Sequence, residues 1–146
     1  MITIRRLGKN DISAFREFVL MFKDVFEMKS TAKLSDTYIK KLLSRPEFIA
    51  LAAFDGSKII GGLTAYELPQ YYGEYAEVYI YDMAVHTPYQ RKGIGKKLIV
   101  ALKDYCKTRG IKTMFVEAHA QDKYAVNFYL ATKGKAEKVV HFNYEL

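Results

Sequence analysis

The segment from Tyr89 to Lys96 carries residues suited to binding an anion. It reads Tyr-Gln-Arg-Lys-Gly-Ile-Gly-Lys and stands between a strand-like stretch and a basic helical one. Gly93 and Gly95 lack a Cβ, so the backbone can approach a pyrophosphate closely, and a helix N-terminus adds about half a positive charge. Full positive charges flank these glycines, on Arg91, Lys92, Lys96 and Lys97. The segment predicts a phosphate-binding loop.

Two common phosphate motifs are excluded. A Walker loop requires G-x-x-x-x-G-K-[ST], and a dinucleotide fingerprint requires G-x-G-x-x-G with an acidic residue about 20 positions on; the chain contains neither. Two glycines alone are also compatible with a tight turn before a solvated basic helix. Other features of the chain must decide between these interpretations.

The charge pattern supports an anionic ligand beside a cationic one. The chain has 23 basic and 16 acidic residues, a formal charge of +7. No Lys or Arg occurs from Ile59 to Gln90, whereas eight occur from Arg91 to Lys112 against one acidic residue, an excess equal to that of the whole chain. The carboxylates of the first segment are Glu67, Glu74, Glu77 and Asp82. Such segregation favours neighbouring sites of opposite charge over a uniformly basic nucleic-acid surface.

Hydrophobic periodicity predicts the elements that position these residues. Their order is β-α-α-β-β-β-α-β-α-β, an α/β (α+β) fold in which residues 76–118 form a βαβ crossover. The predicted strands are 2–6, 48–54, 59–68, 76–85, 111–118 and 135–144; the predicted helices begin at the caps Asn10 or Asp11 and Ser35, and then span 92–109 and 123–133.

Size and composition point to one domain over residues 1–146. No apolar run approaches the roughly 20 residues that span a bilayer, and the N-terminus lacks the pattern of a signal peptide, so we expect a cytoplasmic protein without membrane attachment. Cys106 lies in a helical pattern and is expected to be a packing residue. His86, His119 and His141 lack metal-ligand spacing, so no metal is expected.

The phosphate-loop residues also carry a family resemblance. Gln90, Gly93 and Gly95 follow a long strand as Q-x-x-G-x-G, which resembles the signature of the GNAT superfamily of N-acetyltransferases. The stretches 48–55, 79–85 and 141–142 are similar to the aminoglycoside 3-N-acetyltransferase branch. The resemblance covers about Leu7 to Phe142. It implies a GNAT-type mixed, mostly antiparallel central sheet with flanking helices.

The resemblance also implies acetyl-coenzyme A (acetyl-CoA) as cosubstrate. In the superfamily the strand before the loop pairs its main chain with the pantetheine arm, and a main-chain N–H near its end faces the thioester carbonyl. Met83, Ala84 and Val85 fill that stretch, with Val85 as the expected donor. Asn127 matches a position that touches pantetheine in many members. The implied diphosphate contacts are Gln90, Arg91, Lys92, Gly93, Ile94, Gly95 and Lys96.

The catalytic roles follow from the chemistry of amine acylation. An alkyl amine is mostly protonated at pH 7, so a carboxylate must bind the ammonium and take or relay its proton. Asp82 is the first candidate base and Glu77 the second, and a water relay stays open. Five residues apart, they face opposite sides of a regular strand unless a bulge, as in the family, intervenes. Tyr129, at the family position of a tyrosine acid, is expected to quench the leaving thiolate, although it is also suited to a core position.

The acetyl acceptor is the less determined partner. The branch resemblance implies an aminoglycoside-like or other small cationic amine that attacks the thioester directly. A charge of +7 opposes such a drug at long range, and Lys123 and Tyr124 interrupt a part of the cleft that is more acidic in aminoglycoside enzymes. A polyamine, a protein amine, a non-catalytic coenzyme A sensor and a nucleic-acid-binding module are the alternatives. The predicted last strand, with Phe142 and Tyr144, is suited to pairing two copies as a homodimer.

Overall fold

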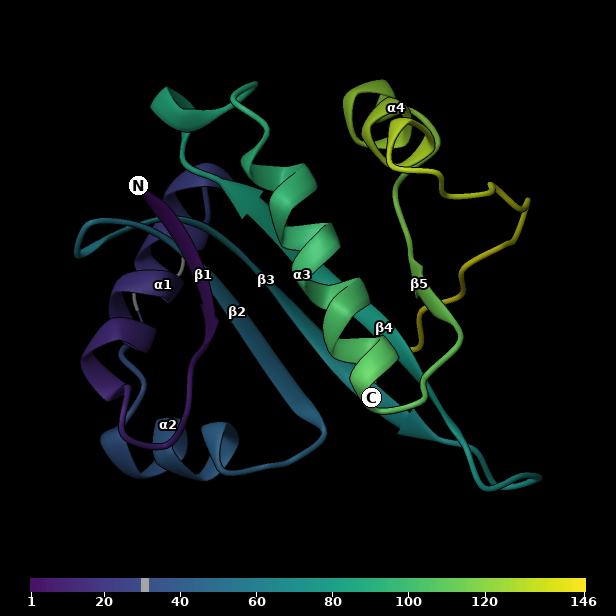
Figure 1. The fold of residues 1–146 in the computed structure, drawn as a ribbon, viewed down its shortest axis with the longest axis horizontal. Coiled ribbons are helices and arrows are strands. Elements are labelled where there is room, and N and C mark those ends of the chain that lie inside the picture. Colours follow the sequence, from purple (N-terminus) through teal and green to yellow (C-terminus); the bar gives the residue numbers. More distant parts are fainter. Residues whose placement is uncertain (30–31) are drawn as a thin grey trace.

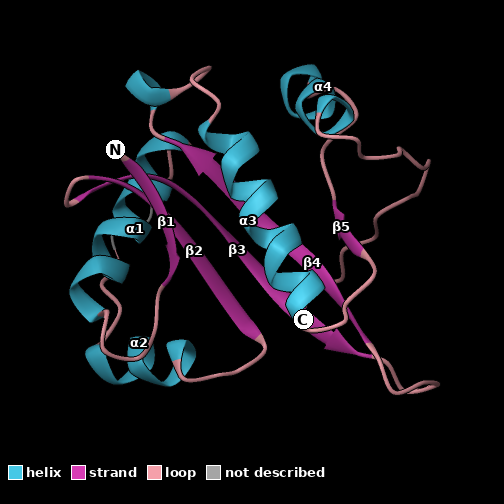
Figure 2. Cartoon of the chain, viewed as in Figure 1, coloured by secondary structure: helices cyan, strands magenta, loops and turns pink. Residues whose placement is uncertain are grey.

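A five-stranded sheet, in the order β1-β2-β3-β4-β5, organises the computed structural model, which describes residues 1–29 and 32–146 (Figure 1). The strands are β1 (Ile2–Arg6), β2 (Phe48–Asp55), β3 (Lys58–Pro69), β4 (Ala76–Val85) and β5 (Met114–Val116). The helices are α1 (Ile12–Val25), α2 (Asp36–Leu43), α3 (Ile94–Thr108) and α4 (Lys123–Ala131), with a 3-10 turn at Thr87–Tyr89 (Figure 2). Among the described residues, no helix is both long and apolar enough to cross a membrane.

The strand pairing changes direction at one edge of the sheet. Strands β1 to β4 are antiparallel neighbours, whereas β4 and β5 run parallel. Strand β3 pairs with β4 as far as Val85, but β5 pairs only with Val78 to Ile80. The second half of β4 is thus hydrogen-bonded along one edge alone. This sheet confirms the expected mixed, mostly antiparallel fold class.

Each face of the sheet buries its own apolar cluster. Helix α3 lies across one face and packs Leu98 and Leu102 on residues such as Ile80 (Figure 1). Helices α1 and α2 cover the other face, where Phe18 is 1% exposed. Gly62 permits that contact, because a Cβ on it would lie 2.2 Å from the Phe18 ring.

The prediction of a last strand over residues 135–144 is wrong. The structure contains no strand there, and Val140, Phe142 and Tyr144 are at least 75% exposed. A segment in which apolar and polar residues alternate forms a half-buried strand only where a neighbouring strand supplies hydrogen bonds and its apolar side chains can pack on the core. Strand β5 is also shorter than the predicted 111–118, covering Met114–Val116. The other predicted elements are present, with ends that differ by a few residues.

A buried ionic network ties the sheet to the C-terminal end of α3. The carboxylate of Glu67 in β3 is buried; it accepts hydrogen bonds from the Tyr105 hydroxyl and, at 3.1 Å, from Arg109 Nη2. Arg6 of β1 donates to the Tyr105 hydroxyl at 3.3 Å and to the Phe48 carbonyl at 2.6 Å. Burial by itself would raise the pKa of Glu67, but the hydrogen bonds from Tyr105 and Arg109 outweigh it and leave that pKa below its usual value.

We expect Glu67→Gln to destabilise the fold by about 1–3 kcal/mol at pH 7, because it leaves Arg109 and Tyr105 poorly partnered. The pKa of Glu67 is lower in the folded chain than in the unfolded chain. The stabilising effect of its carboxylate on the fold is therefore complete at pH values above the pKa in the unfolded chain, and it is lost as the pH falls through the pKa in the folded chain. Urea unfolding at pH 3 to 7 should therefore show a shallower acid dependence for Glu67→Gln than for the native chain. Exposed Glu137 provides the control, and an equal loss in Glu137→Gln would contradict the prediction.

Candidate active site

The unpaired edge of β4 presents free backbone groups. The His86 N–H bonds to the Ile60 carbonyl of β3 at 2.9 Å. Successive peptide groups of a strand point to opposite edges, so the N–H groups of Met83 and Val85 point away from β3, where β5 no longer pairs. The Val85 carbonyl on that edge accepts the Gln90 side-chain nitrogen at 2.9 Å. Gln90 thus holds the start of the loop against the strand and leaves the Val85 N–H available.

The glycine loop forms an uncapped helix N-terminus. Gly93 is the N-cap of α3, with φ of +79° and no side-chain cap, and the first intrahelical bond joins the Lys97 N–H to the Gly93 carbonyl at 3.0 Å. The earlier N–H groups of α3 have no acceptor within the helix. Arg91 also has a positive φ, +60°. The chain therefore turns at Gly93 so that several backbone N–H groups at the start of α3 point outward.

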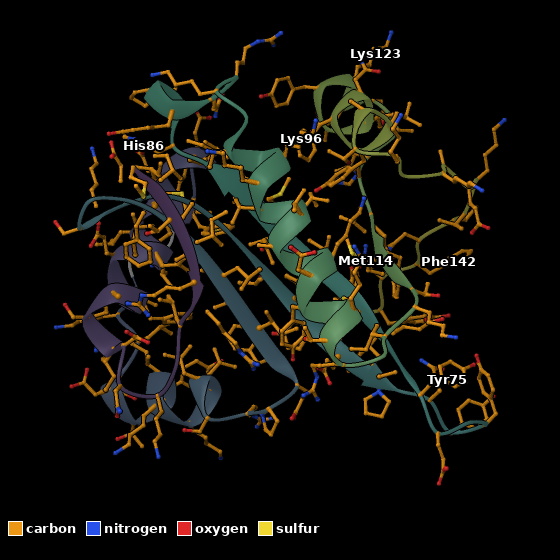
Figure 3. The ribbon with its side chains drawn as sticks, in the orientation of Figure 1. Tyr75, His86, Lys96, Met114, Lys123 and Phe142 are labelled. Atoms are coloured by element: carbon orange, nitrogen blue, oxygen red, sulfur yellow. The ribbon has the colours of Figure 1, made fainter. Side chains whose placement is uncertain are left out.

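Basic side chains surround this turn. Lys96 lies on the first turn of α3, at the end of that helix next to α4 (Figure 3). Lys92 and Lys58 each place an ammonium over the Tyr89 ring, 5.5 and 5.6 Å from its centroid. Positive charge at a helix N-terminus is unfavourable without an anion. Lys58 is the first residue of β3, and sequence reasoning missed it because only the β2–β3 hairpin brings it to the loop.

Two predicted loop residues have a packing role. Ile94 is 3% exposed and belongs to the core under α3, so its backbone alone is available to a ligand. Gly95 faces α4, and a Cβ on it would lie 3.0 Å from the Phe128 ring. The second glycine therefore allows α4 to approach α3, whereas Gly93 supplies the left-handed turn.

A bulge in β4 aligns the two candidate bases. Thr64 pairs with Asp82 and Ala65 with Ile80, so Tyr81 is an additional residue in β4. The bulge that the family resemblance implied is present, and Glu77 and Asp82 lie on the same face, opposite α3. Five residues still separate them by about 15 Å along the strand. Asp82 lies at the open edge, whereas Glu77 lies near the β3–β4 turn, and the structure does not bring the two together.

Asp82 and Tyr129 are electrostatic neighbours. Burial raises the pKa of the Asp82 carboxyl above its usual value. Burial, with the nearby carboxylates of Asp82 and Asp122, raises the pKa of Tyr129 to about 12. Tyr129 packs against the α3 core from α4, beyond the end of β5. A carboxylate and a phenol from distant segments thus flank the free edge of β4.

Asn127 and a surface hollow lie apart from this arrangement. Asn127 is exposed on α4, and two residues from Tyr129 it points to a different side of the helix. A hollow of about 570 Å³ lies between the β3–β4 turn and Gly110, at the opposite end of α3, about 22 Å from the loop. Figure 3 shows Tyr75 at that remote end. Within the described chain, no group of three or more His, Cys, Asp or Glu side chains is placed to hold a metal ion.

Sequence reasoning also missed a group of aromatic rings beside Asp82. Tyr79 and Tyr81 of β4 have ring centroids 6.0 Å apart, and Tyr79 stacks on Phe115 of β5 at 4.8 Å. Side chains alternate between the two faces of β4, and the bulge shifts this alternation by one residue. Allowing for that shift in the sequence would have placed these rings on the same face as Asp82.

The open edge, the uncapped turn and the positive charge fit one kind of ligand. An extended arm carrying amide groups can bond to the free N–H groups of β4, and a diphosphate can bind the donors of α3. Acetyl-CoA has both parts. The residues present therefore fit the cosubstrate expected from the sequence.

Comparisons with known proteins agree with this geometry. An aminoglycoside acetyltransferase from an uncultured soil metagenomic sample, solved with sisomicin, is 43% identical with a TM-score of 0.96, covering 99% of this chain and 96% of that one. A second such enzyme from an uncultured soil metagenomic sample is 33% identical with a TM-score of 0.95, covering 100% and 99%. The [Ribosomal protein bS18]-alanine N-acetyltransferase of Salmonella typhimurium is 32% identical over 68 residues, 47% of this chain and 45% of that protein.

This last match spans less than half of the curated relative, whereas the structural matches span nearly the whole of both chains. The sequence family described as Acetyltransferase (GNAT) family matches residues 14–134. The short pairing of β5 with β4 and the glycine turn before α3 agree with this match. By the family match, the chain belongs to the GNAT acetyltransferase family.

Proposed function

We propose that this domain transfers the acetyl group of acetyl-CoA to a primary amine of a small polycationic acceptor of the aminoglycoside type. The observation that carries the proposal is the free edge of β4, which presents the Val85 N–H; Asp82 lies on the same strand, and its charge acts on the Tyr129 phenol of α4. Bound acetyl-CoA supplies a thioester that is already activated for attack by an amine. The chain has to orient the reactants and manage one proton.

The Val85 N–H has a role in stabilising charge. It points to the open edge, and donors directed at a developing oxyanion stabilise it most when they are fixed in advance. The bond from Gln90 to the Val85 carbonyl holds the peptide group that follows Val85 and so restrains the end of the strand. Gln90 is in this proposal a positioning residue, and the N–H groups at the start of α3 bind the diphosphate.

Asp82 is the base in this proposal, and Glu77 is set aside because it lies too far along the strand. A carboxylate with a raised pKa accepts a proton from an ammonium more readily than an ordinary one. It also attracts the acceptor before the reaction. Burial without a cationic partner thus leaves Asp82 available for the amine.

Tyr129 donates a hydrogen bond to the leaving sulfur. With its pKa at about 12 and an ordinary thiol near 8.5, complete proton transfer from Tyr129 costs about 5 kcal/mol. A hydrogen bond carries no such cost and still stabilises the thiolate. The proton released by the amine then neutralises the sulfur, so Tyr129 keeps its own proton throughout the cycle.

The choice of acceptor rests on the relatives of near-complete coverage, whose names specify aminoglycosides. The partial match to ribosomal-protein-alanine acetyltransferases supports a peptide N-terminus as the second candidate. Cytoplasmic location and a homodimer stay predictions.

Thiol release should be measured with aminoglycosides, polyamines, lysine peptides and an alanine-terminated peptide. Turnover of aminoglycosides at least tenfold above the others supports the proposal, and preference for the peptide overturns the choice of acceptor.

Saturating coenzyme A should raise the Tm of the native chain by roughly 5–10 °C at about 100 times its Kd. Gly93→Ala should lose most of this shift, because an Ala disfavours φ near +79° and the turn must change. Gly110→Ala is the matched control, since Gly110 has φ of +69° at the other end of α3. Equal ligand-induced shifts in both variants would contradict a phosphate site at Gly93, and a Tm raised by DNA or RNA instead would contradict the enzyme.

Asp82→Asn should lower kcat/KM for the amine by about 10² to 10⁴, the usual contribution of general-base catalysis. Since protonation removes the base and the pKa of Asp82 is raised, activity of the native chain should fall on the acid side at a pH above that of an ordinary carboxyl. The variant should lack this limb of the pH profile. Exposed Asp104 on α3 serves as control, and an unchanged acid limb in Asp82→Asn removes Asp82 from the mechanism.

Tyr129→Phe should lower kcat by about 10-fold to 100-fold while the Kd of coenzyme A changes little, because only the hydrogen bond to the charged sulfur is lost. The native chain should show no loss of activity from Tyr129 ionisation below pH 10, because the pKa of Tyr129 is about 12. Tyr72→Phe on the β3–β4 turn is the control. A full rate in Tyr129→Phe would refute its role.

A further inference from the structure

A row of four aromatic rings crosses β3, β4 and β5 beside the candidate base. We call Tyr66, Tyr81, Tyr79 and Phe115 the aromatic row. Consecutive ring centroids lie 6.1, 6.0 and 4.8 Å apart, and the last pair, Tyr79 and Phe115, is parallel to within 8°. These last two residues are also direct partners in the β4–β5 register. The sheet itself therefore holds the row in place.

The row lies on the acceptor side of the sheet and is partly open to solvent. Tyr66 packs with the cluster under α1 and α2, opposite α3. Tyr81, the bulge residue, is 61% exposed and Phe115 is 38% exposed. Adjacent exposed rings on a sheet are typical of a ligand surface, because folding alone gains little from them.

Two carboxylates lie near the Tyr79 ring. Asp82 follows Tyr81 in β4, and Glu117 directly follows the end of β5. Burial, and then the charges of Glu117 and Asp82, raise the pKa of Tyr79, which places both carboxylates within electrostatic reach of its hydroxyl.

A basic nitrogen of the chain already contacts Glu117. The segment after α4 returns beside β5 (Figure 1), and His141 Nδ1 lies 3.2 Å from Glu117 Oε2. The Glu117 side chain is nevertheless 48% exposed. Its carboxylate is thus directed to a place where a nitrogen cation fits, with the Tyr79–Phe115 pair alongside.

We propose that Tyr79, Phe115 and Glu117 form a second acceptor subsite, which binds the distal ring and ammonium of a diamine whose other amine is acetylated beside Asp82. This inference rests on the proposed function and names the acceptor class: a saturated, sugar-like scaffold with two amino groups. Ring faces attract the CH surface and the charge of such a scaffold. Glu117 supplies a charge-assisted hydrogen bond, and His141 gives way to the incoming ammonium.

The test uses a matched pair of acceptors: a diamino disaccharide and the same disaccharide with its distal amine replaced by hydroxyl. Glu117→Gln should raise KM for the diamine about 10-fold to 100-fold, the usual effect of losing a charged hydrogen bond. Its KM for the monoamine, its kcat and its KM for acetyl-CoA should stay unchanged. Exposed Glu74→Gln, which makes the same change of net charge, should alter none of these constants.

Tyr79→Leu provides a second, uncharged variant, and it should weaken both disaccharides relative to a linear polyamine. An equal effect of Glu117→Gln on both disaccharides, an equal effect of Glu74→Gln, or a linear polyamine with the lower KM in the native chain would each overturn the subsite. Calorimetric titration of the diamine into the chain loaded with coenzyme A gives a readout independent of turnover. Absence of acetylation of both disaccharides refutes the proposed function, whereas calorimetric binding that depends on Glu117 still supports the subsite.

Discussion

The separation of β5 from β4 is the constraint on which the site depends. A strand in the middle of a sheet has no free backbone groups, and an edge strand has a full row of them. Here β4 is central over Val78 to Ile80 and an edge strand from Tyr81 to Val85. The transition lies at the bulge, so the same residues that open the edge also turn Asp82 to the face opposite α3. Free backbone donors and the Asp82 carboxylate thus come from one irregularity in one strand.

The two helices beside this edge keep it open in different ways. Helix α3 presents its N-terminus and its basic residues to one end of the edge, and Gly95 lets α4 approach to within contact of it. Helix α4 then carries Tyr129 to the far side of the opening. The buried network around Glu67 holds the other end of α3 to β1 and β3, about 22 Å away. Packing at one end of α3 and ligand binding at the other are thereby kept apart.

The basic and acidic segments of the sequence lie at different places in the folded chain. Basic residues gather at the start of α3, and Lys58, the first residue of β3, adds its charge over the Tyr89 ring. The carboxylates of Asp82 and Glu117 both lie within electrostatic reach of the Tyr79 hydroxyl, in the aromatic row. In the proposed function, the cationic acceptor and the anionic cosubstrate approach the same strand edge, each attracted by charge of the opposite sign. This arrangement offsets the long-range repulsion that a charge of +7 implies.

The sequence by itself determined the family, the fold class, nearly every element and the glycine turn. These depend on local patterns: hydrophobic periods, caps, and a short motif whose residues are neighbours in the chain. It could not determine the last strand, because a strand exists only with a hydrogen-bonding partner. The distance of Glu77 from the opening, the packing role of Ile94 and Gly95, and the meeting of Tyr79, Phe115 and Glu117 were decided by the tertiary structure alone, because strand register and helix packing bring together side chains that no spacing in the sequence relates.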